Sequence, residues 1–126
     1  MTGEHPNVSL MKRLDPSNLA GAKDLFAEDA VFHYFNPNLP DLQGDHVGLD
    51  GIRNFSEIIG ERSRGTFKVN PVSMTAVGDE LVVTQTRNTL TFEDRDIALD
   101  VVVVWRILAG RIVEVWDIVP TQPSEA

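Results

Sequence analysis

The second half of the chain changes its hydrophobic period to two, and this change constrains the fold more than any other feature. After Gly65, apolar and polar residues alternate along four long segments, which is typical of half-buried strands. Short turn sequences separate these segments, so that consecutive ones can pair antiparallel. Pro71 lies inside the first segment and predicts a bulge, because proline cannot donate a hydrogen bond to a neighbouring strand. The sequence therefore predicts an antiparallel meander with strands at 67–77, 81–92, 97–108 and 111–119.

The first half of the chain is predicted to be mainly helical. A short segment at 7–14, apolar at 10, 11 and 14, indicates a first helix. Asp15–Pro16 then has the pattern of an N-cap followed by proline at the first helical position. A β-branched and aromatic strand is expected at 30–35, and a third helix begins near Gly48, after a loop that holds His46. The second helix is expected to bury residues spaced three or four apart, namely Leu19, Ala22, Leu25 and Phe26.

Helices first and one curved sheet afterwards predict an α+β fold. We expect three N-terminal helices packed on a strongly curved, mostly antiparallel sheet, which together form a cone-shaped barrel. The length allows one domain, 1–126, with an ordered core at about 7–119. A cavity between the sheet and the helices is the expected place for function.

Composition excludes several classes of function. The chain has 11 basic and 19 acidic residues, so its net charge is -8 and a basic nucleic-acid-binding face is not expected. The absence of cysteine excludes disulfides, thiolate chemistry and cysteine-bound zinc. The longest apolar run, Val101–Trp105, is too short to cross a membrane. The first residues lack the basic and apolar stretches of a signal peptide, so a cytoplasmic location is expected.

Asp117 is the main candidate for chemistry. On its strand it shares a face with Val113 and Val115, and this valine-rich face is the natural inner one. A single carboxyl on an apolar wall loses hydration, which disfavours the charged form and raises the pKa. A carboxyl with a pKa nearer neutrality can accept a proton and return it. The alternative is a structural carboxylate, exposed at the strand end or paired with Arg106 or Arg111.

Polar side chains on neighbouring strands supply candidate partners. Thr86 and Asn88 share a strand face and can hydrogen-bond a ligand carbonyl or the candidate carboxyl; the alternative is a threonine-rich face in solvent or in a dimer. Tyr34 shares a face with Phe32, and its hydroxyl is a candidate donor to an oxyanion. His33 lies on the other face of that strand and is a candidate general base, with a packed structural histidine as the alternative.

The two tryptophans predict different roles for the two faces of the sheet. Trp105 shares a face with Val101 and Val103, where it forms either an aromatic wall for a flat or cyclic ligand or a part of the core. Trp116 lies on the opposite face, which is too apolar to be left in water. We therefore expect a homodimer formed through the outer sheet face. The expected interface residues are Trp116, Val102 and Val104.

No metal or cofactor is predicted. His33, Asp45 and His46 are the candidate metal ligands, but they are scattered and lack the spacing of a zinc site. The sequence has no nucleotide loop, phosphate cradle or nicotinamide motif.

Two stretches of the sequence resemble a known family. The first combines 25–33 with 48–55, and the second is 104–117, which ends in Gly-Arg-Ile-Val-Glu-Val-Trp-Asp. Their order, spacing and flanking elements resemble the nuclear-transport-factor-2-like superfamily and, within it, the SnoaL-like polyketide cyclase branch. The resemblance covers 7–119. It implies the α+β fold expected above, which hosts isomerases, dehydratases, cyclases, epoxide hydrolases and non-catalytic binders.

The resemblance also implies that Asp117 is a catalytic acid/base, because the cyclases and the epoxide-hydrolase-like members have an aspartate at this place. Other positions depart from the family patterns. The cyclases have a polar residue, often histidine, where this chain has Val103. The arginine and second aspartate of the epoxide hydrolases fall at Thr86 and Asn88. Ketosteroid isomerases would need two acids that are absent here.

The sequence thus predicts a cavity that binds a small hydrophobic or cyclic molecule. The first hypothesis is cofactor-free acid/base catalysis of an isomerisation, cyclisation, dehydration or hydrolysis. The alternative is a non-catalytic ligand-binding or interaction module on the same fold. The candidate catalytic residues are Asp117, Tyr34 and His33. The candidate ligand-binding residues are Phe32, Thr86, Asn88, Val101, Val103, Trp105 and Val115.

Overall fold

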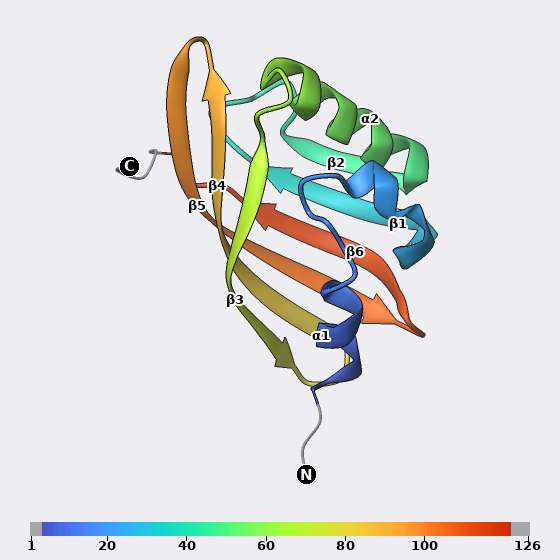
Figure 1. Ribbon diagram of the computed structural model, residues 1–126. Helices are drawn as coiled ribbons and strands as arrows, with labels where there is room; N and C mark the ends of the chain where they lie inside the picture. Colours follow the sequence, from blue (N-terminus) through green and yellow to red (C-terminus); the bar gives the residue numbers. More distant parts are fainter. Residues whose placement is uncertain (1–3, 122–126) are drawn as a thin grey trace.

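The computed structural model describes residues 4–121, which form one six-stranded sheet with helices on one side (Figure 1). The start of the chain, on which the predicted location rests, lies partly outside these residues. The strand order is β2-β1-β6-β5-β4-β3. The strands are β1 (Phe26–Phe35), β2 (Gly44–Val47), β3 (Lys68–Val77), β4 (Leu81–Phe92), β5 (Arg95–Leu108) and β6 (Arg111–Ile118).

The predicted meander is confirmed. Strands β3 to β6 pair antiparallel in chain order, and β1 joins the sheet by running parallel to β6. The expected bulge is present in β3, where the register shifts between Pro71 and Ser73. Strand β5 begins at Arg95, two residues earlier than predicted, because Glu93 and Asp94 alone make the turn, both with positive φ.

The prediction of three α-helices is correct for two of them. Helices α1 (Pro6–Met11) and α2 (Gly48–Arg62) are α-helical, whereas η1 (Leu19–Leu25) is a kinked 3₁₀ helix. The predicted start of this middle helix is wrong. Asp15 accepts a hydrogen bond from the Ser17 amide in a local turn, and the cap is Asn18, whose Oδ1 accepts from the Gly21 amide.

Two strand boundaries also differ from the prediction. Strand β1 begins at Phe26 and not at 30, because Phe26 already pairs with Ile112 of β6. The segment predicted as a loop before α2 contains β2, which pairs antiparallel with β1. The Gly-Asp-His-Val sequence of β2 is too short and too polar to show a strand pattern.

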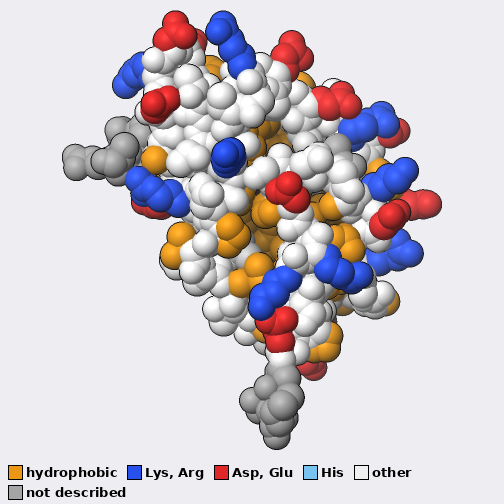
Figure 2. Space-filling model, in the orientation of Figure 1, with side chains coloured by type: hydrophobic (Ala, Val, Ile, Leu, Met, Phe, Trp, Pro, Cys, Tyr) orange, Lys and Arg blue, Asp and Glu red, His pale blue; other side chains and the backbone are white. Residues whose placement is uncertain are grey.

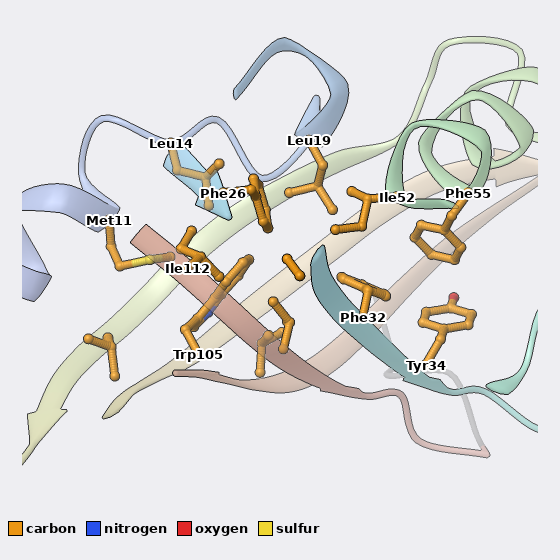
Figure 3. Packing of buried hydrophobic residues seen from close by; sticks show 14 of the residues in the cluster. Met11, Leu14, Leu19, Phe26, Phe32, Tyr34, Ile52, Phe55, Trp105 and Ile112 are labelled. Atoms are coloured by element: carbon orange, nitrogen blue, oxygen red, sulfur yellow. The ribbon is translucent and has the colours of Figure 1, made fainter. Parts of the chain in front are cut away.

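The core lies between the sheet and the helices. Helix α2 packs on β1 and η1, while α1 contacts β3 and β4 (Figure 1). Phe32 from β1 and Phe55 from α2 have ring centroids 4.9 Å apart, and Trp105 and Ile112 continue the cluster toward α1 (Figure 3). In the described part of the chain, no helix is both long enough and apolar enough to span a membrane.

Candidate functional site

Asp117 lies on the inner face of the sheet, near the end of β6. In the strand register it is the neighbour of Tyr34 on β1 and of Val103 on β5. Its Oδ1 has almost no solvent-accessible surface and no hydrogen-bond partner among residues 4–121. No salt bridge within these residues joins Asp117 to Arg106 or Arg111, and Arg106 instead pairs with Glu80 and Glu114. The alternative of an exposed or arginine-paired carboxylate therefore does not describe this side chain.

Burial raises the pKa of Asp117 from 3.8 to about 7. The cause is desolvation, because the low-dielectric surroundings disfavour the charged carboxylate and, within residues 4–121, Oδ1 has no hydrogen-bond partner to compensate. Near neutral pH the carboxyl is thus present in both protonation states. This is the electrostatic condition for a group that both accepts and returns a proton.

The inner face of β6 differs from strict alternation at its start. The sequence pattern places Val113 on the inner face, but Ile112 is the buried residue, with no exposed surface, and Val113 is half-buried. The register between β5 and β6 shifts between Arg106 and Ile107, so one extra residue of β6 is accommodated before Glu114. Beyond this bulge the predicted alternation holds, and Val115 and Asp117 face inward.

Tyr34 is buried beside Asp117. Its phenol oxygen accepts a hydrogen bond of 2.9 Å from Nδ2 of Asn36, and its ring meets the ring of Phe55 edge-on with centroids 4.6 Å apart. Burial raises the pKa of Tyr34 to about 12; the Asn36 hydrogen bond opposes this shift and the nearby Asp117 charge adds to it. Tyr34 therefore stays protonated and is available as a hydrogen-bond donor.

Two cavities on the inner side of the sheet have walls that include register neighbours of Asp117. Figure 2 shows hydrophobic side chains gathered in a depression near the middle of this face. The α2 cavity has a volume of about 250 Å³, and its walls include Tyr34, Asn36, Phe55, Asn88, Leu99 and Val119. The α1 cavity has a volume of about 380 Å³, and its walls include Met11, Leu14, Thr84, Thr86, Val103 and Trp105.

The structure divides the predicted ligand-binding residues among three places. Asn88 lines the α2 cavity, while Thr86, Val103 and Trp105 line the α1 cavity. Asp117 lines neither cavity, although its register neighbours Tyr34 and Val103 belong to one cavity each. The remaining predicted residues line neither cavity and pack in the core; they are Phe32, Val101 and Val115.

Thr84, Thr86 and Asn88, the polar residues on the inner face of β4, are buried. Thr86 Oγ1 donates to Asn88 Oδ1 at 2.9 Å, so the amide nitrogen of Asn88 is left to face the α2 cavity. Thr84 accepts a hydrogen bond of 3.1 Å from the indole nitrogen of Trp105. The alternative of a solvent-exposed threonine face is therefore wrong for this strand. Thr84 was not singled out from the sequence, although it shares the alternating face of Thr86.

His33 lies on the outer face of the sheet, away from Asp117 and both cavities. Its Nδ1 is 2.6 Å from Asp45 Oδ1 and its Nε2 is 2.7 Å from Glu114 Oε2, and its ring stacks on Trp116. Burial alone lowers the pKa of His33, but the hydrogen bonds to Glu114 and Asp45 outweigh it and the net shift is upward. The structure thus separates this candidate base from the other two candidate catalytic residues.

His46 belongs to β2 and packs inward. Its Nε2 lies 2.7 Å from the Leu42 carbonyl oxygen, and its ring is 4.9 Å from that of Phe55. Among residues 4–121, no three histidine or acidic side chains are grouped so that they could hold a metal ion. His33 and His46 lie on opposite faces of the sheet.

Asn36 is another residue of this site that was not singled out from the sequence. It follows β1 directly, in a proline-containing segment that predicts only a loop. Its contact with Tyr34 depends on how this loop folds back over the end of β1. The alternation of β1 cannot show this, because Asn36 lies outside the strand.

Comparison with known proteins gives a family match over most of the chain. The model of the SnoaL-like domain matches residues 9–115, inside the core predicted at 7–119. No curated protein matches. Among solved structures, Bal32a from a soil-derived mobile gene cassette is 22% identical, with a TM-score of 0.76 over 90% of this chain and 88% of that one.

Two further structures show the same fold. An NTF2-like protein from Anabaena variabilis is 16% identical, with a TM-score of 0.77 over 97% of this chain and 96% of that one. TerC, crystallised with polyporic acid, is 20% identical, with a TM-score of 0.73 over 91% of this chain and 92% of that one.

Proposed function

The chain belongs to the SnoaL-like domain family, and from this premise we propose that it binds a small hydrophobic molecule and transforms it by cofactor-free acid/base catalysis, with Asp117 as the proton carrier. The observation that carries the proposal is the Oδ1 of Asp117, which is buried and has no hydrogen-bond partner in the described part of the chain. A buried polar atom without a partner destabilises the fold, so its presence calls for an explanation beyond stability.

The surroundings of Asp117 fit a reaction at a carbonyl or ring oxygen. Tyr34 and Asn88 bring a hydroxyl and an amide to the wall of the α2 cavity, where they can donate hydrogen bonds to an oxygen that gains negative charge. Asp117, adjacent to Tyr34, would remove a proton from the ligand and return it at another atom. Isomerisation, aldol-type cyclisation, dehydration and hydrolysis all use this combination of groups.

The cavities favour a molecule of mainly apolar surface. Aromatic and aliphatic side chains form most of their walls, and Trp105 gives the α1 cavity an aromatic face. The structural similarity to TerC, which was crystallised with polyporic acid, is consistent with a cyclic ligand.

A second candidate function is ligand binding without catalysis. The observation that favours it is Val103, the register neighbour of Asp117, which supplies no polar partner, while Asp117 itself lines neither cavity. In this case the tyrosine and amide donors would orient a ligand, and the carboxyl would be structural.

Carbon-detected NMR titration of the Asp117 carboxyl in the free protein tests the proposal. We expect a pKa well above the ordinary value of about 3.9. Asp41 is a control in the same spectra. Its hydrogen bond with Arg62 lowers its pKa, so its titration midpoint should lie below the ordinary value while that of Asp117 lies above it. A pKa of Asp117 at or below the ordinary value would show a solvated or ion-paired carboxylate, count against Asp117 as the proton carrier and favour the binding function.

We also propose that two copies associate through the outer face of the sheet. Trp116, Val102 and Val104 are half-buried in the single chain. Phe35 and Ile118, which border them, are 51% and 48% exposed. These residues form an apolar surface that a second copy would cover. A cytoplasmic location also stays a prediction.

A further inference from the structure

Asn36 is held in one orientation by the backbone next to it. It is 4% exposed, and its Oδ1 accepts a hydrogen bond of 3.0 Å from the amide of Asn38. A backbone N–H can only donate, so the oxygen of the Asn36 side chain must face Asn38. Its nitrogen must then face Tyr34, where Nδ2 donates to the phenol oxygen at 2.9 Å.

This orientation determines how Tyr34 can use its hydroxyl proton. Because the phenol oxygen accepts from Asn36, the proton of Tyr34 cannot be donated back to the same nitrogen. None of residues 4–121 accepts a hydrogen bond from this hydroxyl. Tyr34 lines the α2 cavity, and its register neighbour is Asp117. The proton is thus available to a ligand in that cavity.

We propose that Asn36 is a positioning residue, which makes Tyr34 an obligatory hydrogen-bond donor toward the α2 cavity and thereby selects ligands that place a carbonyl or other acceptor oxygen there. This inference rests on the proposed function for the use that the ligand makes of the donor. The orientation of Tyr34 by Asn36 is a property of the free protein and can be tested without Asp117 or a substrate.

The first experiment uses the fact that Tyr34 is the only tyrosine of the chain. A fluorinated tyrosine incorporated throughout the protein therefore reports this position alone, and its lower pKa makes the titration accessible to ¹⁹F NMR. Asn36→Leu removes the donor to the phenolate, and Asn36→Asp keeps the shape and the acceptor for Asn38 but cannot donate when ionised. We expect the pKa of the fluorotyrosine to rise in both variants.

Asn38→Asp is the matched control. It adds the same charge two residues away, on the wall of the same cavity. Asn38 is exposed, and its side chain hydrogen-bonds the Thr121 carbonyl oxygen and not Tyr34. If Asn36→Asp shifts the fluorotyrosine no more than Asn38→Asp does, the positioning role is wrong, even where Asn36→Leu does not fold. Asn36→Leu adds no charge, so a rise of the fluorotyrosine pKa in that variant reports the lost hydrogen bond and not repulsion between two negative charges.

The second experiment measures ligand selection with two probes of the same carbon skeleton, 1-tetralone and tetralin. Only the ketone has an acceptor oxygen, so the ratio of the two affinities isolates the hydrogen bond from hydrophobic burial. We expect Asn36→Asp and Tyr34→Phe each to lower this ratio about fivefold, the value of one neutral hydrogen bond. A ratio that falls in Tyr34→Phe but persists in Asn36→Asp would overturn the role of Asn36.

The two proposals fail in distinguishable ways. An ordinary pKa of Asp117 would count against the catalytic function, while the fluorotyrosine shifts and the ketone preference would still support Asn36. Unchanged fluorotyrosine titration in Asn36→Asp, with a raised pKa of Asp117, would overturn the positioning role alone.

Discussion

At the scale of single residues, Asp117 makes stability depend on pH. Its pKa is raised from 3.8 to about 7 on folding, so between these values the folded protein binds more protons than the unfolded one. The free energy of unfolding must therefore fall as pH rises through this window, by an amount on the order of a few kcal/mol, and stay low above it. Asp117→Asn keeps the shape and does not titrate. We expect urea unfolding at about pH 5 and about pH 8 to show the decrease in the wild type and a smaller one in the variant.

His33 gives a second pH effect with a different window. A neutral imidazole has one N–H, so donating to both Asp45 and Glu114 requires the doubly protonated ring. The folded pKa is raised, so this stabilisation is complete below the unfolded value of 6.5 and is lost as pH rises through the folded value. We expect His33→Gln to destabilise the protein in thermal unfolding at about pH 6 and much less at about pH 9. An equal loss at both pH values would show that the imidazolium contributes nothing by its charge.

The two residues also show what alternation can predict. The inward position of Asp117 follows from period two alone, once Val115 is taken as a core residue. Period two does not predict that Ile112 occupies the inner face in place of Val113. That position depends on a bulge, which is determined by the pairing between two strands. The raised pKa of Asp117 was predictable in direction, since burial of a carboxyl among valines has one sign. The contact between Asn36 and Tyr34 was not, because it depends on a loop conformation.

At the scale of elements, α2 packs on the sheet through two buried side chains, Ile52 and Phe55. Phe55 is buried, and its ring contacts those of Phe32 and Tyr34 (Figure 3). It also contacts the ring of His46. Its removal leaves a cavity under the helix, so we expect Phe55→Ala to cost about 3–5 kcal/mol in chemical denaturation. Asn54→Ala, exposed on the same helix, should change stability by less than about 0.5 kcal/mol. A loss below about 1 kcal/mol for Phe55→Ala would mean that other contacts hold α2 in place.

The elements differ in how well the sequence predicts them. Long strands with period two, such as β4, are found at their observed bounds because each residue adds to one signal. The 3₁₀ helix η1 has apolar residues at helical spacing, but it has a kink at Ala22 and packs against α2, and neither feature follows from the spacing. Strand β2 is formed only because β1 offers it an edge. Short elements that depend on a neighbouring element thus have no pattern of their own from which the sequence could predict them.

At the scale of the whole molecule, the sheet separates two kinds of chemistry. The inner face carries Asp117 and Tyr34, beside two apolar cavities. The outer face carries an apolar surface and the charged bridge that His33 forms with Asp45 and Glu114. The parallel pairing of β1 with β6 produces this arrangement, because it places Tyr34 beside Asp117 on one face and His33 beside Trp116 on the other.

The apolar surface on the outer face of the sheet predicts how two copies of the chain assemble. Trp116 is stacked on His33, so Trp116→Glu also disturbs the charged bridge, whereas Ile118→Glu changes only an exposed residue of the same face. A carboxylate buried in an apolar interface is strongly unfavourable, so we expect each variant to sediment as a monomer at concentrations where the wild type is a dimer. Val77→Glu, at a similarly exposed position on β3, is the control and should sediment like the wild type. An unchanged mass in both Ile118→Glu and Trp116→Glu would show that a dimer, if formed, uses another surface.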